Sequence, residues 1–231
     1  MDNRMAFLTT ISQALGREIR YTPEQGTPPV NNFAQTRLTG LSLQQRCDQF
    51  IEVASTVMLA HCELTREENA GEAVLNLCKK YGSQPVVVSG DERLKALGIT
   101  QRLEEVYDAF IWDPAKGEEN IRKAEQAKVG VVFAEYGLTE SGGVVLYSSP
   151  ERGRSLSLLP AASIFVVRKS CILPRVAQLA QALHQKAQAG ERMPSCINLI
   201  GGPSSTADIE LIKVVGVHGP VNAAYLIIED C

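Results

Sequence analysis

The sequence predicts an α/β protein whose mixed, mainly parallel sheet is flanked by helices and preceded by an N-terminal helical extension. Short runs of β-branched and other apolar residues recur after Pro85, and helical patterns lie between several of them. Most of these runs are apolar throughout instead of alternating, which is typical of strands buried on both faces of a sheet. The two observations together favour a sheet covered by helices. The runs are PVVVSG, AFIWD, VGVVFAEYG, GGVVLYSS, SIFVVR, INLIGG and AAYLIIED.

The first forty residues are expected to form a helix and a linker arm outside the main domain. Apolar side chains recur on one face between Met5 and Leu15, and the following YTPEQGTPPVNN is rich in proline and asparagine. We therefore assign residues 1–40 to the arm and residues 41–231 to an α/β domain, with helices in 42–80 and the sheet core in 85–231.

Two capping boxes predict two helices before the sheet core. The pairs with the S/T-x-x-E/Q spacing are Ser42 with Gln45 and Thr65 with Glu68. Gly82 is expected to end the second helix. His61 would then lie at the end of the first helix, where the helix dipole favours its charged form; a metal pair with Cys62 is the alternative.

Within the sheet core, helices are expected near residues 92–97, 118–127 and 174–188. The stretch from Val129 to Ser149 breaks this alternation of strand and helix, because only a tight polar turn separates its two apolar runs. It predicts a hairpin or an antiparallel pair of strands.

Composition and charge exclude several classes of protein. The chain has 231 residues, 45% of them hydrophobic, with a formal net charge of −3 and a pI near 5.7. It has no basic stripe of the kind that binds nucleic acid. No apolar run reaches the ~20 residues of a membrane helix, and the N-terminus lacks the apolar core of a signal peptide. We expect a cytoplasmic protein that binds neither nucleic acid nor membrane.

The six cysteines include no C-x-x-C pair. Iron–sulfur and zinc sites usually need such clustered thiolates, so we expect no metal in this chain. We interpret the cysteines as reduced thiols in a reducing compartment. The sequence also contains neither a P-loop nor a G-x-G-x-x-G fingerprint, and no cofactor is evident in it.

Three polar loops are candidates for a ligand site, because ligands of open α/β sheets gather at the carboxyl ends of strands. One of them, GGPSSTADIELIKVVGVHGP from Gly201 to Pro220, follows a strand and is expected to lead into a helix. Ser204 or Ser205 would cap that helix, with Asp208 in its first turn, and its N-terminus would bind a phosphate or a carboxylate. A plain strand–turn–helix connection is the alternative.

Glu140 and His218 are the candidate catalytic residues. His218 stands between small residues in GVHGP, which leave an imidazole accessible for proton transfer; a solvated or core histidine is the alternative. Glu140, in TESGG, is suited to act as a general base, a nucleophile or a hydrogen-bond anchor. The alternative is that Glu140 is a turn residue whose carboxylate only accepts backbone hydrogen bonds. Arg152 and Arg154, in the third loop SPERGRSLSLLP, have guanidinium groups that suit a bound anion; a solvated charged loop is the alternative.

The loop sequences GLTESGGVVL, RSLSLLP and GPSSTADIELIKVVGVHGP together resemble the lactate utilization protein C family of the LutC/YkgG type, whose domain is called LUD. The likeness extends over nearly the whole chain and is strongest to the enterobacterial YkgG-type members. It implies a fold similar to the sugar-phosphate isomerase and CoA-transferase group (NagB/RpiA-like). It also implies a component of a system that oxidises L-lactate to pyruvate together with iron–sulfur partner proteins.

On this interpretation the three loops bind a small anionic metabolite, and a homo-oligomer is left open. The alternatives are a non-catalytic binding or scaffold module for the iron–sulfur partners, and a transferase acting on CoA or sugar phosphates. The residues expected to bind the ligand are Ser141, Gly142, Gly143, Arg154, Gly202, Ser204, Ser205, Thr206, Asp208 and Gly219.

Overall fold

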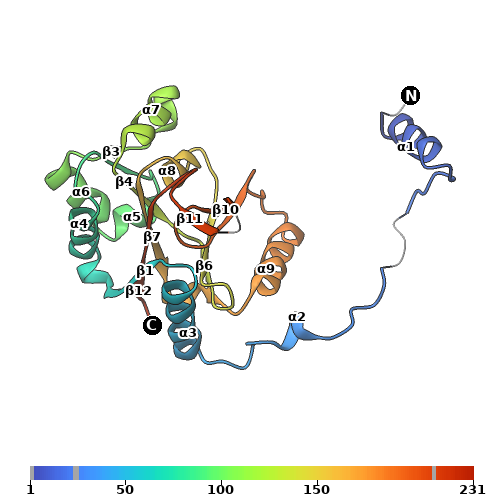
Figure 1. The fold of residues 1–231 in the computed structure, drawn as a ribbon, viewed down its shortest axis with the longest axis horizontal. Coiled ribbons are helices and arrows are strands. Elements are labelled where there is room, and N and C mark those ends of the chain that lie inside the picture. Colours follow the sequence, from blue (N-terminus) through green and yellow to red (C-terminus); the bar gives the residue numbers. More distant parts are fainter. Residues whose placement is uncertain (1–2, 23–25, 210–211) are drawn as a thin grey trace. The chain divides into compact units, whose positions relative to one another are not determined.

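A computed structural model of the chain describes residues 3–22, 26–209 and 212–231, except the side chains of Asp208 and Ile209 (Figure 1). The chain divides into two units, Met1–Asn32 and Phe33–Cys231. The first unit holds α1 (Asn3–Ala14), which confirms the helix predicted near its start. The second unit contains the sheets and all the candidate site residues.

Parallel strands form the main sheet of the second unit. Among the described residues there are six of them, in the order β1-β12-β7-β4-β2-β3. Ile164 in the middle of the sheet pairs with Val131 on one side and with Ala224 on the other, and all three side chains are buried. The strands are β1 (His61–Arg66), β2 (Val86–Val88), β3 (Phe110–Ile111), β4 (Val129–Phe133), β7 (Ala162–Arg168) and β12 (Asn222–Glu229).

Both faces of the main sheet are covered, as the continuous apolar runs predicted. One face packs against α4 (Ala70–Lys80), α5 (Glu92–Ala96) and α6 (Ile99–Tyr107), with Leu77 and Leu94 in the core. The other face packs against α3 (Leu43–Thr56), α7 (Glu118–Gln126), α8 (Ser155–Leu158) and a second sheet, with Phe50 and Tyr225 in the core. Short 3₁₀ turns, η1 (Glu67–Asn69), η2 (Pro114–Lys116) and η3 (Lys169–Cys171), join these elements.

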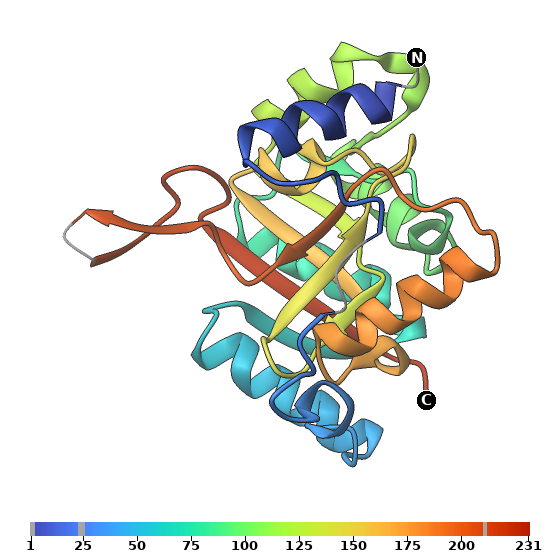
Figure 2. The ribbon, with the colours of Figure 1, turned by 90° about the vertical axis from the view of Figure 1, so that its right-hand side faces the viewer.

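The second sheet lies over the main sheet and carries α9 (Val176–Gln188) on its outer side (Figure 2). Its described strands follow the order β8-β5-β6-β9. Tyr136 of β5 pairs antiparallel with Val145 of β6, which confirms the predicted hairpin. Leu179 of α9 packs on Leu138 and Val145 to form a third core. The strands are β5 (Tyr136–Leu138), β6 (Gly143–Tyr147), β8 (Ile172–Leu173) and β9 (Ile197–Ile200).

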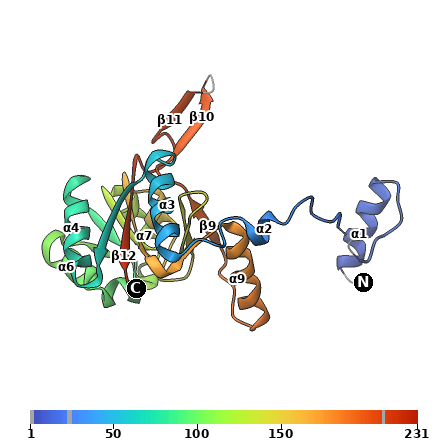
Figure 3. The ribbon, with the colours of Figure 1, turned by 90° about the horizontal axis from the view of Figure 1, so that it is seen from below.

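The helix predicted after Ser204 and Ser205 is wrong. The chain instead forms an antiparallel hairpin, β10 (Ser205–Ile209) and β11 (Ile212–Val215), which extends away from the sheets (Figure 3). β-Branched residues supply most of the apolar side chains here, and they favour strands over helices. The backbone of Asp208 lies in β10, so this residue has no place in a first helical turn, and its side chain lies outside the described part.

The first of the two capping boxes is confirmed and the second is wrong. The amide of Gln45 donates to Ser42 Oγ at 3.2 Å, and the amide of Ser42 donates to Gln45 Oε1 at 2.9 Å. Thr65, however, lies in β1, and α4 begins only at Ala70. His61 consequently starts a strand instead of ending a helix, because parallel pairing with β12 overrides the local helical pattern.

Candidate functional site

The two ends of the Gly201–Pro220 loop, residues 201–205 and 218–220, form one wall of a hollow between the edge strand β9 and the face of the main sheet. The hollow has a volume of about 340 Å³. Ser204, Ser205 and His218 line it from the loop, and Ser157 and Ser163 line it from α8 and β7. We call it the serine–histidine hollow. The structure thus brings together the residues that the sequence predicted from opposite ends of this loop.

The two ends of the β10–β11 hairpin are fastened together at the rim of this hollow. The amide of Ser204 donates to the Pro220 carbonyl at 2.9 Å, and the amide of Gly216 donates to the Ser204 carbonyl at 2.8 Å. Gly219 packs so closely on Ser204 that a Cβ atom at residue 219 would lie 3.2 Å from the Ser204 Cβ. These contacts fix the position of His218 relative to the serines.

Gly202 fixes the turn between β9 and the hairpin. Its φ is +69°, and a Cβ atom there would lie 1.9 Å from the carbonyl oxygen of Met58. Its amide donates to the hydroxyl of Tyr225 at 2.7 Å, and that hydroxyl donates to the Ile200 carbonyl at 3.2 Å. Burial raises the pKa of Tyr225, so the hydroxyl stays protonated and keeps this role.

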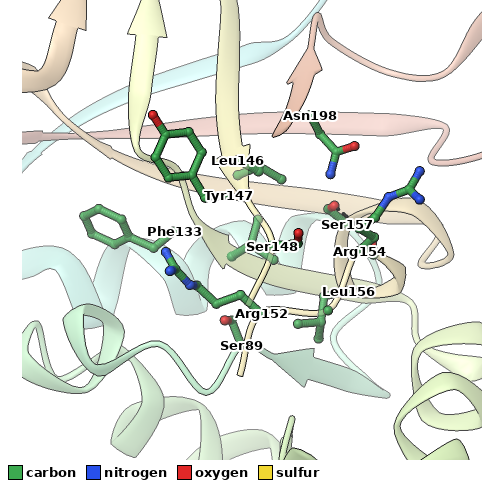
Figure 4. Close-up of a pocket in the computed structure, with 12 residues that line it drawn as sticks. Ser89, Phe133, Leu146, Tyr147, Ser148, Arg152, Arg154, Leu156, Ser157 and Asn198 are labelled. Carbon is green, nitrogen blue, oxygen red and sulfur yellow. Dashed lines mark hydrogen bonds between the residues drawn. The ribbon is translucent and has the colours of Figure 1, made fainter. Parts of the chain in front are cut away.

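Arg154 lies beside the serine–histidine hollow, in an adjoining hollow of about 20 Å³, just large enough for one water molecule. Figure 4 shows its side chain with those of Ser157 and Asn198. Ser157 lines both hollows, and its hydroxyl donates to the Arg154 carbonyl at 3.2 Å. The carbonyl of Ser157 in turn accepts a hydrogen bond from Ser163 at 2.9 Å. Arg154 is therefore connected to the hollow through Ser157.

Glu140 does not line the serine–histidine hollow. It lies at a different hollow, with Ser141 and Gly143, and the segment Leu199–Gly201 lies between the two. Arg175 Nε donates to Glu140 Oε2 at 2.6 Å, and Arg37 Nε lies 3.2 Å from Glu140 Oε1. The structure thus separates the two predicted catalytic residues and places the Glu140 carboxylate between two arginines.

Gly142, in the same turn as Glu140, packs against helix α3. Its φ is +62°, and a Cβ atom there would lie 2.5 Å from the amide nitrogen of Ala54. Gly142 therefore contacts the last turn of α3, and Gly202 contacts Met58 two residues beyond it, so two of the three predicted loops meet near this end of α3. Thr206, the remaining residue predicted to bind a ligand, lies in β10.

Sequence reasoning missed an ionic network at the carboxyl ends of β2 and β4. Arg93 donates to Asp91 Oδ2 and to Glu135 Oε1, each at 2.7 Å, and Arg152 also pairs with Glu135. Burial alone would raise the pKa of Asp91, but hydrogen bonds from Arg93 outweigh it and hold that pKa below its usual value. Asp91 also caps α5. Its place in the sequence, directly after the glycine that ends PVVVSG, could have indicated this helix cap.

The comparisons with known proteins identify the family. The model of the LUD domain matches residues 47–228. The chain belongs to the LUD domain family. Over their whole lengths, this chain and an Escherichia coli (strain K12) protein named "Uncharacterized protein YkgG" are 69% identical.

More distant members of the LUD family carry a functional name. "Lactate utilization protein C" of Macrococcus caseolyticus is 42% identical over 99% of this chain and 96% of its own length. The protein of the same name from Bacillus subtilis is 40% identical over 100% of this chain and 98% of its own length. A crystal structure of a DUF162 family protein from Deinococcus radiodurans superposes with a TM-score of 0.57 at 19% identity, covering 81% of this chain and 99% of the other, which supports the α/β fold.

Two further observations bear on this LUD domain. Across residues 3–22, 26–209 and 212–231, the structure shows no group of three His, Cys, Asp or Glu side chains placed to hold a metal ion. No helix in the same ranges combines the length and the apolar character that crossing a membrane requires.

Proposed function

We propose that this LUD-domain protein takes part in lactate utilization and binds the L-lactate anion in the serine–histidine hollow. The names of the relatives at about 40% identity support the pathway. Those relatives match over nearly the whole chain, so the domain that carries the hollow is common to them.

The lining of the hollow carries the proposal. Four hydroxyl side chains and one imidazole face a volume of about 340 Å³, and none of the described lining residues has a carboxylate. Ser157 and Ser163 donate to backbone carbonyls, so Ser204 and Ser205 are the hydroxyl donors that a small anion meets here, without a like charge beside them. The 2-hydroxyl of lactate also needs a partner that accepts a proton, and His218 is the residue of that kind among the described lining.

We assign the roles by chemistry. Ser204 and Ser205 donate to the lactate carboxylate, and Arg154 balances its charge from the adjoining hollow. His218 accepts the proton of the 2-hydroxyl as the carbonyl of pyruvate forms. The C2 hydrogen leaves as a hydride, which is one proton with two electrons, to a hydride acceptor outside this chain. We propose that this acceptor passes the two electrons one at a time to the iron–sulfur partner proteins.

His218 suits proton transfer better than Glu140 does. The Glu140 carboxylate is ion-paired to Arg37 and Arg175, and Arg175 also donates to the Phe33 carbonyl at 2.6 Å. Both carboxylate oxygens of Glu140 are thus engaged by arginines, and Glu140 lies outside the serine–histidine hollow. We therefore assign Glu140 to fastening α2 (Phe33–Thr36) against α9.

Growth on L-lactate tests this assignment. In a strain that lacks the gene, wild type and Glu140→Gln are expected to restore growth, and His218→Ala is not, at equal protein levels measured by immunoblot. Growth with His218→Ala at the wild-type rate would remove His218 from the reaction. Failure of Glu140→Gln with a normal level of folded protein would return Glu140 to the catalytic role.

A scaffold for partner proteins is the second candidate, and the N-terminal unit favours it. The α1 side chain of Phe7 is 64% exposed, and Leu15 just after α1 is 59% exposed. Exposed apolar side chains on a separate helix suit the binding of another protein. Copurification with the iron–sulfur partners, with and without residues 1–32, tests this. Equal recovery of the partners in both cases would rule out a docking role for the unit.

A further inference from the structure

We propose that Arg152 is a positioning residue that holds the loop Ser149–Arg154 against the main sheet and thereby sets the place of Arg154. This inference rests on the proposed function for its ligand. The loop follows β6, and the main sheet offers it three anchor points at the ends of β2, β3 and β4.

The side chain of Arg152 makes the contact with β4. Its guanidinium pairs with Glu135, which comes two residues after β4, and Nη1 lies 3.6 Å from Asp91 Oδ2. Its Nε donates to Ser149 Oγ at 3.0 Å, which closes the turn on itself. Glu135 is held in place from its other side by Arg93. The carboxylate that receives Arg152 is thus already oriented.

Backbone groups of the loop make the contacts with β2 and β3. The Glu151 carbonyl accepts from the Gly90 amide at 3.1 Å, just after β2. The Pro150 carbonyl accepts from Trp112 Nε1 at 2.9 Å, just after β3. The indole ring also packs on Gly153, where a Cβ atom would lie 2.1 Å from Trp112 Cζ2. No side chain fits there without moving Trp112.

Arg154 follows directly on this anchored segment, and Ser157 lies on the next turn of chain. Removing the Arg152 side chain frees the turn from β4 and leaves the contacts with β2 and β3 to hold the loop alone, which loosens its packing on Trp112. Two guanidinium groups face two carboxylates in this network, so it serves as a fixed support for the loop. Losing a charge-assisted contact between Arg154 and the bound carboxylate would weaken binding by about ten- to a hundredfold.

The test uses the full chain and three kinds of measurement. Trp112 is the sole tryptophan, so its emission and its quenching by acrylamide report on the loop. Trypsin cleavage after Arg154 reports on release of the loop. Calorimetric titration with L-lactate reports on binding. Arg168→Gln is the matched control, because Arg168 is similarly exposed at 30% against 28% and pairs with Glu67 and Asp230 elsewhere.

Arg152→Gln is expected to redden the Trp112 emission, to speed cleavage after Arg154, and to weaken L-lactate binding by about ten- to a hundredfold. Arg152→Lys keeps the charge and is expected to recover part of each effect. Arg168→Gln is expected to leave all three at wild-type values. Should Arg152→Gln fail to fold, the same three measurements are made on Arg152→Lys and on Gly153→Ala. The added methyl group of Gly153→Ala pushes against the Trp112 ring.

Two outcomes overturn the proposal. Wild-type emission and cleavage in Arg152→Gln would show that Arg152 does not hold the loop. A released loop with an unchanged L-lactate affinity would show that the loop does not position the binding group. A wild-type chain that binds no L-lactate would instead contradict the proposed function, and emission and cleavage would still decide whether Arg152 holds Arg154 in place.

Discussion

At the scale of single residues, Gly202 is a position that the structure restricts to glycine. Its φ is +69°, and a Cβ atom would lie 1.9 Å from the Met58 carbonyl oxygen. Gly202→Ala is therefore expected to lower the free energy of unfolding by about 2–4 kcal/mol, measured by urea denaturation. Gly201→Ala is the control, since its Cβ would meet the movable Met58 sulfur at 3.0 Å and should cost far less. Equal losses would contradict this account of the turn.

Asp91 makes stability depend on pH. Its pKa is lowered in the folded state, so its contribution is complete above its ordinary value of 3.8 and is lost as the pH falls below that value through the folded pKa. Asp91→Asn keeps the cap of α5 and removes the charge that faces Arg93 and Arg152. We expect wild type to be more stable than Asp91→Asn at pH 7, and the difference to shrink between pH 4 and pH 2. A gap that widens in acid would contradict the sign of this shift.

Residues close together in one motif were predicted more successfully than residues paired across the chain. The Ser204–Ser205 and His218–Gly219 segments belong to one loop, and the structure places them at one hollow. The arginine partners of Glu140 come from other elements, and nothing in TESGG indicates them. The sequence could therefore name Glu140 as special but had no means to show that it is already ion-paired.

At the scale of elements, the capping box of α3 is an independent contributor to stability. Ser42→Ala removes the hydrogen bond from the Gln45 amide and is expected to cost about 1 kcal/mol in thermal or urea unfolding. Asn69→Ala is the control at the start of α4, because the Asn69 side chain makes no capping hydrogen bond. A cost for Asn69→Ala as large as that for Ser42→Ala would argue against the capping explanation.

Strands whose residues form a continuous apolar run were predicted from sequence. Strands without such a run, which form because another strand pairs with them, were not predicted. β2 and β4 lie within predicted apolar runs, and β7 and β12 match theirs except for one added residue at the start of each. No strand was predicted at β1, between the two expected helices, and β1 forms because it pairs with β12. The helix expected after Ser204 and Ser205 failed for a related reason, since the β-branched residues there pair with each other in a hairpin. Pairing between segments is a tertiary effect that local patterns do not contain.

At the scale of the whole molecule, the second unit begins at Phe33 because α2 is tied to α9. Arg175 donates to the Phe33 carbonyl, and Gln178 Nε2 donates to the Ala34 carbonyl at 3.0 Å. A chain that begins at Phe33 is expected to melt at the temperature of the full chain. A chain that begins at residue 41 loses these bonds and the Arg37–Glu140 pair, and it should be about 1–3 kcal/mol less stable. Equal melting of both shortened chains would contradict the tie.

Titration of L-lactate into the purified full chain tests the central claim most directly. We expect L-lactate to bind at one site, more tightly than propionate, which lacks the 2-hydroxyl. His218→Ala is expected to weaken L-lactate at least about tenfold, or about 1.4 kcal/mol, and Glu140→Gln to bind as wild type does. No binding by the wild type, or the same affinity with and without His218, would contradict the assignment of the serine–histidine hollow as the lactate site.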